Sequence, residues 1–239
     1  MQSMIFCAGL GTRFKPWTDT HPKCLALING KSLLQRNVEY LQKAGIDRVI
    51  VNVFHFADQV IDTVEANHGW GSDIVFSDER PQVLETGGGL LFAKDLFPMG
   101  DDFICMNADI LCDLDIRDMV RSHRRQDSFV TLAVSDRQSS RCFTFDQDQR
   151  LTGWRNLATG EEKTAIPSNS NQDKAFSGIS VFSYDYFDFV EQTGKFSLVD
   201  SWLSLASDHP IRSFDHSGSR WVDVGRPESV AVAEALFND

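Results

Sequence analysis

The segment MIFCAGLGTR, residues 4–13, joins a short apolar run to a loop with two glycines. Met4–Ala8 predicts a buried strand, because a short apolar run that ends at glycine is typical of a strand covered on both faces. Glycines let a backbone approach a phosphate and turn its N–H groups toward it. No Gly-Lys-Ser/Thr follows, as a Walker A loop requires, and Phe14 stands where a dinucleotide-binding fingerprint has its third glycine. The segment alone leaves a plain strand-to-loop turn as an equal alternative.

Strand and helix patterns alternate after this loop. Ser32–Ala44 has apolar residues at helical spacing and stops at Gly45, whereas Arg48–Val53 is β-branched. Further helices are expected over Ala57–Ala66, Gly89–Leu96 and Asp115–Arg125, and strands over Ile74–Ser77, Asp102–Met106 and Ser128–Val134. This rhythm predicts an α/β fold, a mainly parallel mixed sheet with helices on both faces.

Ligands of such sheets bind beyond the carboxyl ends of the strands. Three segments fall at those ends in this chain: Gly9–Arg13, Glu85–Gly89 and Asn107–Asp109. We therefore expect these segments to form one site.

The pattern changes after Val134. Cys142–Asp146 and Arg150–Arg155 predict a hairpin, Thr159–Lys174 a polar mobile loop, and Phe176–Phe182 a strand. Helices are expected over Tyr186–Gln192, Leu198–Ser207 and Pro227–Phe237, and a final hairpin over Ile211–His216 and Ser219–Val224. With neither repeat nor linker, one domain is expected over residues 1–239, with a parallel half to residue 134 and a more antiparallel half from residue 135.

The composition excludes several classes of partner. The chain has 239 residues and a formal net charge of −11, whereas non-specific nucleic-acid or anionic-membrane binding needs Lys and Arg against phosphates. We therefore expect no nucleic-acid or membrane partner. Five cysteines, an odd number without a C-x-x-C pair, predict buried free thiols. The sequence shows neither a signal-peptide pattern nor a membrane-length apolar run, which predicts a cytoplasmic protein.

Two cations, Arg13 and Lys23, follow the glycines of this acidic chain. Such charge can stabilise a leaving pyrophosphate and a five-coordinate phosphorus, although a solvated surface lysine is the ordinary alternative for Lys23 alone. Pro16, Thr18, Pro22 and Gly30-Lys31-Ser32-Leu33 extend the pattern. From Gly9 to Leu33 the chain resembles the signature of the sugar-nucleotide pyrophosphorylase family: G-x-G-T-R-x-x-P-x-T, then P-K, then G-K-P-L. Ser32 stands in place of the last proline.

Later segments resemble the same family in the same order. Leu84–Gly89 resembles the segment that holds the base and ribose, and Asn107-Ala108-Asp109 resembles N-G-D, with Ala108 for the usual glycine. Phe176–Val181 resembles the sugar-binding strand, and Trp221–Gly225 resembles W-x-D-x-G. The resemblance covers nearly the whole chain and implies a Rossmann-like fold of the nucleotide-diphospho-sugar transferase type without a C-terminal β-helix. It is closest to N-acetylmuramate 1-phosphate uridylyltransferases and mannose-1-phosphate guanylyltransferases.

The resemblance also implies roles for single residues. The implied nucleotide-binding residues are Ala8, Gly9, Gly11, Thr12, Arg13, Lys23, Glu85, Thr86, Gly87 and Gly88, with Arg13 and Lys23 catalytic. The implied sugar-binding residues are Asn107, Ser177 and Gly178. Asp109 and Asp223 are implied to hold Mg²⁺, which typically takes one or two carboxylates plus phosphates and water. Taken singly, each motif has a plain alternative as a turn or a helix cap.

One element of larger family members is missing. Their E-K-P segment carries a lysine that holds the sugar phosphate, whereas Glu162-Lys163 here lacks the proline. Arg141 and Arg155 are possible substitutes, with ordinary surface charge as the alternative for each. Trp154, Phe176 and Trp202 either flank an apolar group of the sugar or belong to the core.

These roles imply an enzyme that uses Mg²⁺ to join a nucleoside triphosphate to a sugar 1-phosphate and releases pyrophosphate. UTP with N-acetylmuramate 1-phosphate is the expected pair; GTP with mannose or heptose 1-phosphate and CTP with phosphocholine are alternatives. A glycosyltransferase would use a D-x-D motif such as Asp113-Leu114-Asp115, but a helix cap before Ile116 is the favoured interpretation of these aspartates. A non-catalytic regulatory module of the same fold is the remaining alternative.

Overall fold

The computed structural model describes residues 1–238. The helices are α1 (Leu33–Lys43), α2 (Ala57–Ala66), α3 (Glu85–Phe92), α4 (Ile116–Arg125), α5 (Tyr186–Phe189), α6 (Leu198–Leu205) and α7 (Ser229–Leu236), and the 3-10 turns are η1 (Thr12–Phe14), η2 (Trp17–Asp19), η3 (Lys23–Leu25), η4 (His68–Gly71) and η5 (Lys94–Leu96). The strands are β1 (Gln2–Phe6), β2 (Leu27–Ile28), β3 (Lys31–Ser32), β4 (Arg48–Val53), β5 (Asp73–Asp78), β6 (Phe103–Asn107), β7 (Ile110–Cys112), β8 (Val130–Ser135), β9 (Arg141–Phe145), β10 (Leu151–Asn156), β11 (Glu161–Thr164), β12 (Gln172–Phe182), β13 (Ile211–Asp215) and β14 (Trp221–Asp223).

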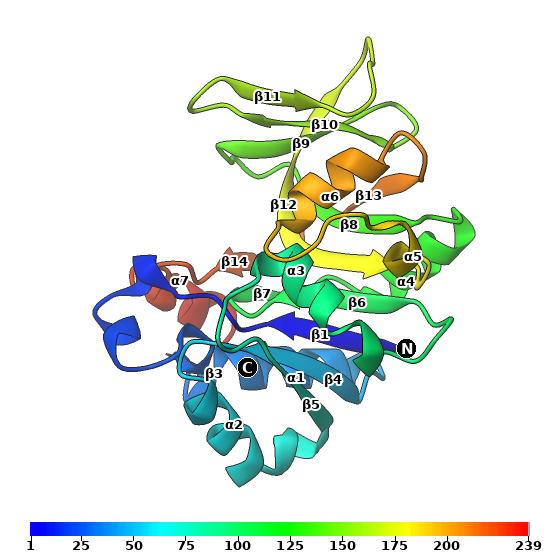
Figure 1. Cartoon of the computed structure of the whole chain (residues 1–239). Helices are drawn as coiled ribbons and strands as arrows, with labels where there is room; N and C mark the ends of the chain where they lie inside the picture. The colour runs from blue at the N-terminus through cyan, green and yellow to red at the C-terminus, as the bar shows by residue number, and fades with distance from the viewer. Residues whose placement is uncertain (239) are drawn as a thin grey trace.

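A ten-stranded mixed sheet forms the frame of the molecule. Its main path runs β11-β10-β9-β12-β6-β1-β4-β5, and β8 joins β12 to β13. The pairs β6–β1, β1–β4 and β4–β5 are parallel, whereas β12 pairs antiparallel with β6, β8 and β9. The predicted parallel first half and more antiparallel second half are confirmed. Figure 1 shows β9, β10 and β11 at one end of the molecule, away from β4 and β5.

The central strands are buried on both faces. Ile5 of β1 packs with Val49 and Val51 in one core, whereas Met4 packs with Ile50 in the other. Successive side chains of a strand point to opposite faces, so both must be apolar where helices cover both faces. This explains the continuous apolar runs that predicted these strands.

Helices cover each face of the sheet, as predicted. The first core includes apolar residues of α1, α2 and α4, and the second includes residues of α3, α5 and α6. A third cluster packs Ala233 of α7 and the following Phe237 with Phe14 of η1 and Val222 of β14. The C-terminal segment thereby comes to lie beside the first loop of the chain.

Ser32, which departs from the proline of the resembled signature, begins α1. Its Oγ accepts a hydrogen bond from Gln35 N at 3.0 Å, which makes it the N-cap of this helix. Serine is among the preferred N-cap residues because its hydroxyl satisfies an otherwise unpaired N–H. The departure is therefore compensated locally.

Two expectations for the second half were wrong. Thr159–Lys174 contains β11, which pairs antiparallel with β10, and the start of β12. Ile211–His216 and Ser219–Val224 do not form a hairpin: β13 pairs parallel with β8, and β14 pairs antiparallel with β7. Strand β11 was missed because it is too polar to show an apolar pattern. The pairing of β13 and β14 was missed because their partners, β8 and β7, lie far away in the sequence.

Other expectations met the structure more closely. The helix predicted from Gly89 begins at Glu85, so the glycine run lies inside α3, and β7 was missed because it has three residues. All five cysteines are buried and free, as predicted. Within residues 1–238, no helix combines the length and the apolarity needed to cross a membrane.

The structure favours the capping interpretation of Asp115. Its Oδ1 accepts hydrogen bonds from Arg117 N at 2.8 Å and Asp118 N at 3.2 Å, at the start of α4. Asp113 instead accepts from the backbone and guanidinium of Arg220. The two aspartates of the D-x-D motif are thus both engaged in local structure.

We predict that Asp115→Ala lowers the free energy of unfolding by about 1 kcal/mol, because two N–H groups of α4 lose their acceptor. Asp115→Asn keeps a capping oxygen and should stay within a few tenths of a kcal/mol of the parent. Urea denaturation of the three proteins measures the difference. Equal stability of the alanine and parent proteins would contradict the capping role.

Candidate active site

The first loop is held in shape by hydrogen bonds around Gly11. Gly11 has φ +59°, and a Cβ added there would lie 2.7 Å from Thr18 Cγ2. Its carbonyl accepts hydrogen bonds from Phe14 N at 2.8 Å and Thr18 Oγ1 at 2.9 Å. This left-handed, tightly packed position needs glycine. The loop therefore carries Thr12 and Arg13 outward on a fixed turn.

A cavity of about 480 Å³ opens at the carboxyl ends of β1 and β6. Its lining includes Ala8, Gly9, Gly11, Thr12, Arg13, Lys23, Glu85, Thr86, Asn107 and Asp109, all of which the sequence singled out. Gly225, after β14, and Lys195 also line it. The three segments expected to meet at the strand ends thus surround one cavity.

The acidic residues of the site lie on neighbouring strands. Asp223 pairs across from Ile110, and Val224 N donates to the Asp109 carbonyl at 2.8 Å. Lys23 Nζ contacts Asp109 Oδ2 at 2.5 Å. Burial raises the pKa of Asp223, and the charge of Asp109 raises it further, while Lys23, Arg13 and Arg137 oppose this. Asp109, Lys23 and Arg13 line the cavity, whereas Asp223 does not line it and lies directly behind the lining residue Gly225, where an added Cβ would be 2.7 Å from Asp223 Oδ1.

This donor set fits a hard divalent cation. Asp223 Oδ1 is buried and has no hydrogen-bond partner within residues 1–238, so it is an acceptor without a donor. Magnesium binds oxygen ligands and typically keeps one or two protein carboxylates while taking phosphates and water. Asp109 and Asp223 are the residues that would hold it. The part of the chain that the structure describes has no cluster of three or more His, Cys, Asp or Glu placed for a metal.

Gly87 and Gly88 face away from the cavity. Their N–H groups donate to the Phe196 carbonyl at 2.9 and 3.2 Å, and side chains added there would overlap Phe196 and the backbone of Gly194. The run is therefore a packing surface for the segment before α6, a different use of glycine from the predicted base contact. Thr86, which does line the cavity, accepts from Leu198 N at 3.1 Å.

A buried polar network connects the end of β1 with the start of α3, and sequence reasoning missed it. Asn52 Oδ1 accepts from Cys7 N at 2.7 Å, and Asn52 Nδ2 donates to Glu79 Oε1 at 2.6 Å. Glu79 Oε2 accepts from Leu84 N at 2.8 Å, and burial raises the pKa of this carboxyl. The network fixes the end of β1 relative to the start of α3. Its sequence signals were an asparagine within a β-branched strand and an acidic residue directly after β5.

The predicted sugar residues lie along the junction of β6 and β12. Asn107 lines the cavity, and Gly178, with φ +78°, packs where an added Cβ would lie 3.2 Å from Asn107 Nδ2. Ser177 is fully buried, and its Oγ lies 2.7 Å from His216 Nε2. Ser177 and Gly178 therefore shape the wall beside Asn107 and do not line the cavity themselves.

The other sugar-half candidates are engaged elsewhere. Trp202 is buried in the second core, whereas Lys163 pairs with Asp200 at 2.9 Å and lies over the Trp154 ring. Arg155 lies near Glu162 and Asp173. None of these side chains lines the 480 Å³ cavity.

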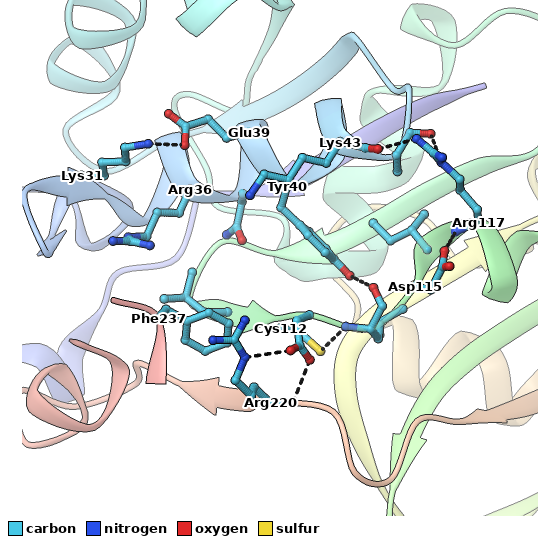
Figure 2. A pocket seen from close by; sticks show the side chains of 16 residues that line it. Lys31, Arg36, Glu39, Tyr40, Lys43, Cys112, Asp115, Arg117, Arg220 and Phe237 are labelled. Carbon is cyan, nitrogen blue, oxygen red and sulfur yellow. Dashed lines mark hydrogen bonds and ion pairs between the residues drawn. The ribbon is translucent and has the colours of Figure 1, made fainter. Parts of the chain in front are cut away.

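Figure 2 shows a second cavity, between α1 and the segment from β7 to α4. At about 540 Å³ it is larger, but none of the predicted site residues lines it. Ion pairs join much of its charge, such as Lys31 with Glu39 and Arg220 with Asp113. Asn37 lines this cavity and donates to the Ala108 carbonyl at 2.9 Å, so it holds the segment before Asp109 from behind.

Comparisons with known proteins show the family of the chain. The model of the nucleotidyl transferase family matches residues 2–238. The chain belongs to this family. The N-acetylmuramate alpha-1-phosphate uridylyltransferases of Caulobacter vibrioides and Neisseria meningitidis are 29% and 25% identical to it, over 98% and 99% of this chain and 95% and 98% of theirs.

A solved structure has the same fold over its whole length. HddC from Yersinia pseudotuberculosis complexed with GMP-PN is 25% identical, covers 99% of each chain and has a TM-score of 0.78. The predicted family, the Rossmann-like fold and the class of enzyme are thereby confirmed. The 480 Å³ cavity lies at the carboxyl ends of the strands, which is where folds of this kind bind their ligands.

The buried network gives a testable consequence. A glutamine at position 79 has one acceptor oxygen for two donors, so Glu79→Gln should leave Asn52 Nδ2 or Leu84 N unpaired. We predict a loss of about 1–3 kcal/mol in unfolding free energy and a raised KM for the nucleoside triphosphate. Urea denaturation and initial rates measure the two effects. Glu65→Gln, on the exposed face of α2, is the matched control, and equal behaviour of both variants would refute the network's role.

Proposed function

We propose that this nucleotidyl transferase uses Mg²⁺ to transfer a nucleotidyl group from a nucleoside triphosphate to a sugar 1-phosphate. The observation that carries the proposal is a cavity lined by the glycine loop, Arg13, Lys23 and Asp109, with Asp223 directly behind its lining residue Gly225. The relatives from Caulobacter vibrioides and Neisseria meningitidis are named as enzymes that act on a sugar 1-phosphate.

The reaction exchanges one phosphorus–oxygen bond for another. A phosphate oxygen of the sugar 1-phosphate bonds to the α-phosphorus of the triphosphate, and the bond from that phosphorus to the β-phosphate oxygen breaks, which releases pyrophosphate. The attacking oxygen is ionised near neutral pH, so the protein need not supply a general base. Electrostatic stabilisation and positioning are then the main tasks of the enzyme.

The residues of the cavity divide these tasks. Gly9, Gly11 and Thr12 receive the phosphates on the turn after β1, and Thr86 and Glu85 lie where the base and ribose would rest. Arg13 stabilises the departing pyrophosphate, and Lys23 the charge at the α-phosphate. Asp109 and Asp223 would hold Mg²⁺, which when bound neutralises charge on the phosphate oxygens.

The proposed substrate pair is UTP with N-acetylmuramate 1-phosphate. The Caulobacter vibrioides and Neisseria meningitidis relatives, which match over nearly their whole length, are both named N-acetylmuramate alpha-1-phosphate uridylyltransferase. The second candidate is GTP with a mannose- or heptose-type sugar, because the matched Yersinia structure is a complex with GMP-PN and a Gibberella zeae relative, 25% identical, is a mannose-1-phosphate guanyltransferase. This chain covers 64% of the length of that relative.

Pyrophosphate release with Mg²⁺ tests the substrate pair. The panel combines UTP, GTP, CTP and dTTP with N-acetylmuramate, mannose, glucose and manno-heptose 1-phosphates and phosphocholine. We predict turnover with UTP and N-acetylmuramate 1-phosphate. Preference for GTP with mannose or heptose, or for CTP with phosphocholine, would replace the proposed pair, and silence of the folded protein would favour a regulatory module.

The acidic pair gives a second prediction. Asp109→Asn and Asp223→Asn should each lower kcat by about 100-fold or more, because each removes a negative metal ligand from charge stabilisation at the reacting phosphate. Asp115→Asn, in the rival D-x-D motif, should keep the parent kcat. Circular dichroism and melting curves confirm that the variants fold. Near-parent turnover of either first variant would remove that aspartate from the mechanism.

A further inference from the structure

Arg137, which follows β8, contacts β14 and β12 in the second half of the chain. Its guanidinium Cζ lies 3.9 Å from the centroid of the Trp221 ring, and one Nη donates to the Phe176 carbonyl. Trp221 and Asp223 point to the same face of β14, because the fully packed Val222 between them points into the third core. The guanidinium therefore lies on the face of β14 that carries Asp223.

Part of the hydrogen-bonding capacity of Arg137 is not used by the residues around it. Its Nε is buried and has no partner in the part of the chain that the structure describes. Burial lowers the pKa of this guanidinium, and the charge of Asp223 opposes that effect. A half-buried cation whose buried N–H has no partner is costly unless an anion completes it.

The position of Arg137 separates it from the nucleotide. Arg13 and Lys23 come from the loop after β1, whereas Arg137 comes from the second half and bonds to the residue before Ser177-Gly178. It lines a separate cavity of about 550 Å³ with Ser139, Cys142 and Leu157 and is not among the residues that line the 480 Å³ cavity. Its contact with the Trp221 ring and its bond to the Phe176 carbonyl place it near β14 and the Ser177-Gly178 wall, in the second half of the chain.

We propose that Arg137 binds an anionic oxygen of the sugar substrate, either its 1-phosphate or a carboxylate. This inference rests on the proposed function. Lys163 and Arg155 are paired with carboxylates instead, and the proposal uses the planar fork of arginine, which matches phosphate and carboxylate geometry. Trp221 fixes the guanidinium plane by stacking, and Trp221 is itself held by a hydrogen bond from Nε1 to the Ser177 carbonyl at 2.9 Å.

Steady-state kinetics of Arg137→Gln and Arg137→Lys test the inference. We expect KM for the sugar 1-phosphate to rise about 10-fold or more in Arg137→Gln, the effect of losing a charge-assisted hydrogen bond, with KM for the nucleoside triphosphate unchanged. Arg137→Lys keeps the charge, and its KM for the sugar 1-phosphate should lie between those of the parent and Arg137→Gln. Arg125→Gln, an exposed arginine at the end of α4, controls for loss of a positive charge.

A purely structural role would move different quantities. If Arg137 only holds β12 against β14, Arg137→Gln would lower the melting temperature and change both KM values or kcat alone. If the parent turns over and the two variants Arg137→Gln and Arg125→Gln have equal KM for the sugar 1-phosphate, the inference is overturned while the proposed function stands. Absence of turnover by the parent across the panel overturns both.

A second sugar separates the two anionic groups. N-acetylmuramate 1-phosphate carries a carboxylate that N-acetylglucosamine 1-phosphate lacks, and the latter serves as substrate or competitive inhibitor. A similar loss of affinity for both in Arg137→Gln assigns the guanidinium to the 1-phosphate. A loss confined to the muramate compound assigns it to the carboxylate, and Arg137 then determines sugar specificity.

Discussion

The structure depends on keeping two carboxylates close to one cavity: Asp109, which lines it, and Asp223, which lies behind the lining residue Gly225. Burial disfavours the charged form of Asp223, and the negative charge of Asp109 repels it, so the pKa of Asp223 is raised. The chain offsets this with Lys23 at 2.5 Å from Asp109, with Arg13 on the same loop, and with Arg137 from the far half. A chain of net charge −11 thus concentrates cations around this pair of carboxylates.

The sheet makes this concentration possible. Parallel strands β1, β4 and β6 end at one edge, so the loops that follow them converge there. Antiparallel β12 then brings the second half alongside β6, and the pair β7–β14 places Asp223 across from Ile110, the residue after Asp109. Hydrogen bonds from Asn37, Asn52 and Glu79 fix these loops from behind, so that the charged side chains meet with little freedom.

Much of this could be predicted from the sequence. The parallel half followed from apolar runs that strands buried on both faces require, as in Met4–Ala8 and Arg48–Val53, and the site followed from a long motif with fixed spacing. The failures have two causes. The segment Glu161–Thr164 is too polar to show a strand pattern, although its partner β10 directly precedes it in the chain. The other cause is pairing at a distance, since nothing near Ile211 indicates β8 as its partner. Arg137 and Glu79 were missed for the same reason, because their importance comes from neighbours far along the chain.

The central claim is that the acidic pair and its cations support nucleotidyl transfer, and the fate of the phosphorus atoms tests it most directly. UTP labelled in turn at the α- and γ-phosphates is incubated with Mg²⁺, N-acetylmuramate 1-phosphate and the parent protein, and again with Asp223→Asn. The account predicts that the α-label appears in the nucleotide sugar and the γ-label in pyrophosphate, and that both transfers fall sharply in the variant. Appearance of the γ-label in free phosphate or on the sugar, or equal α-label transfer by the variant, would contradict it.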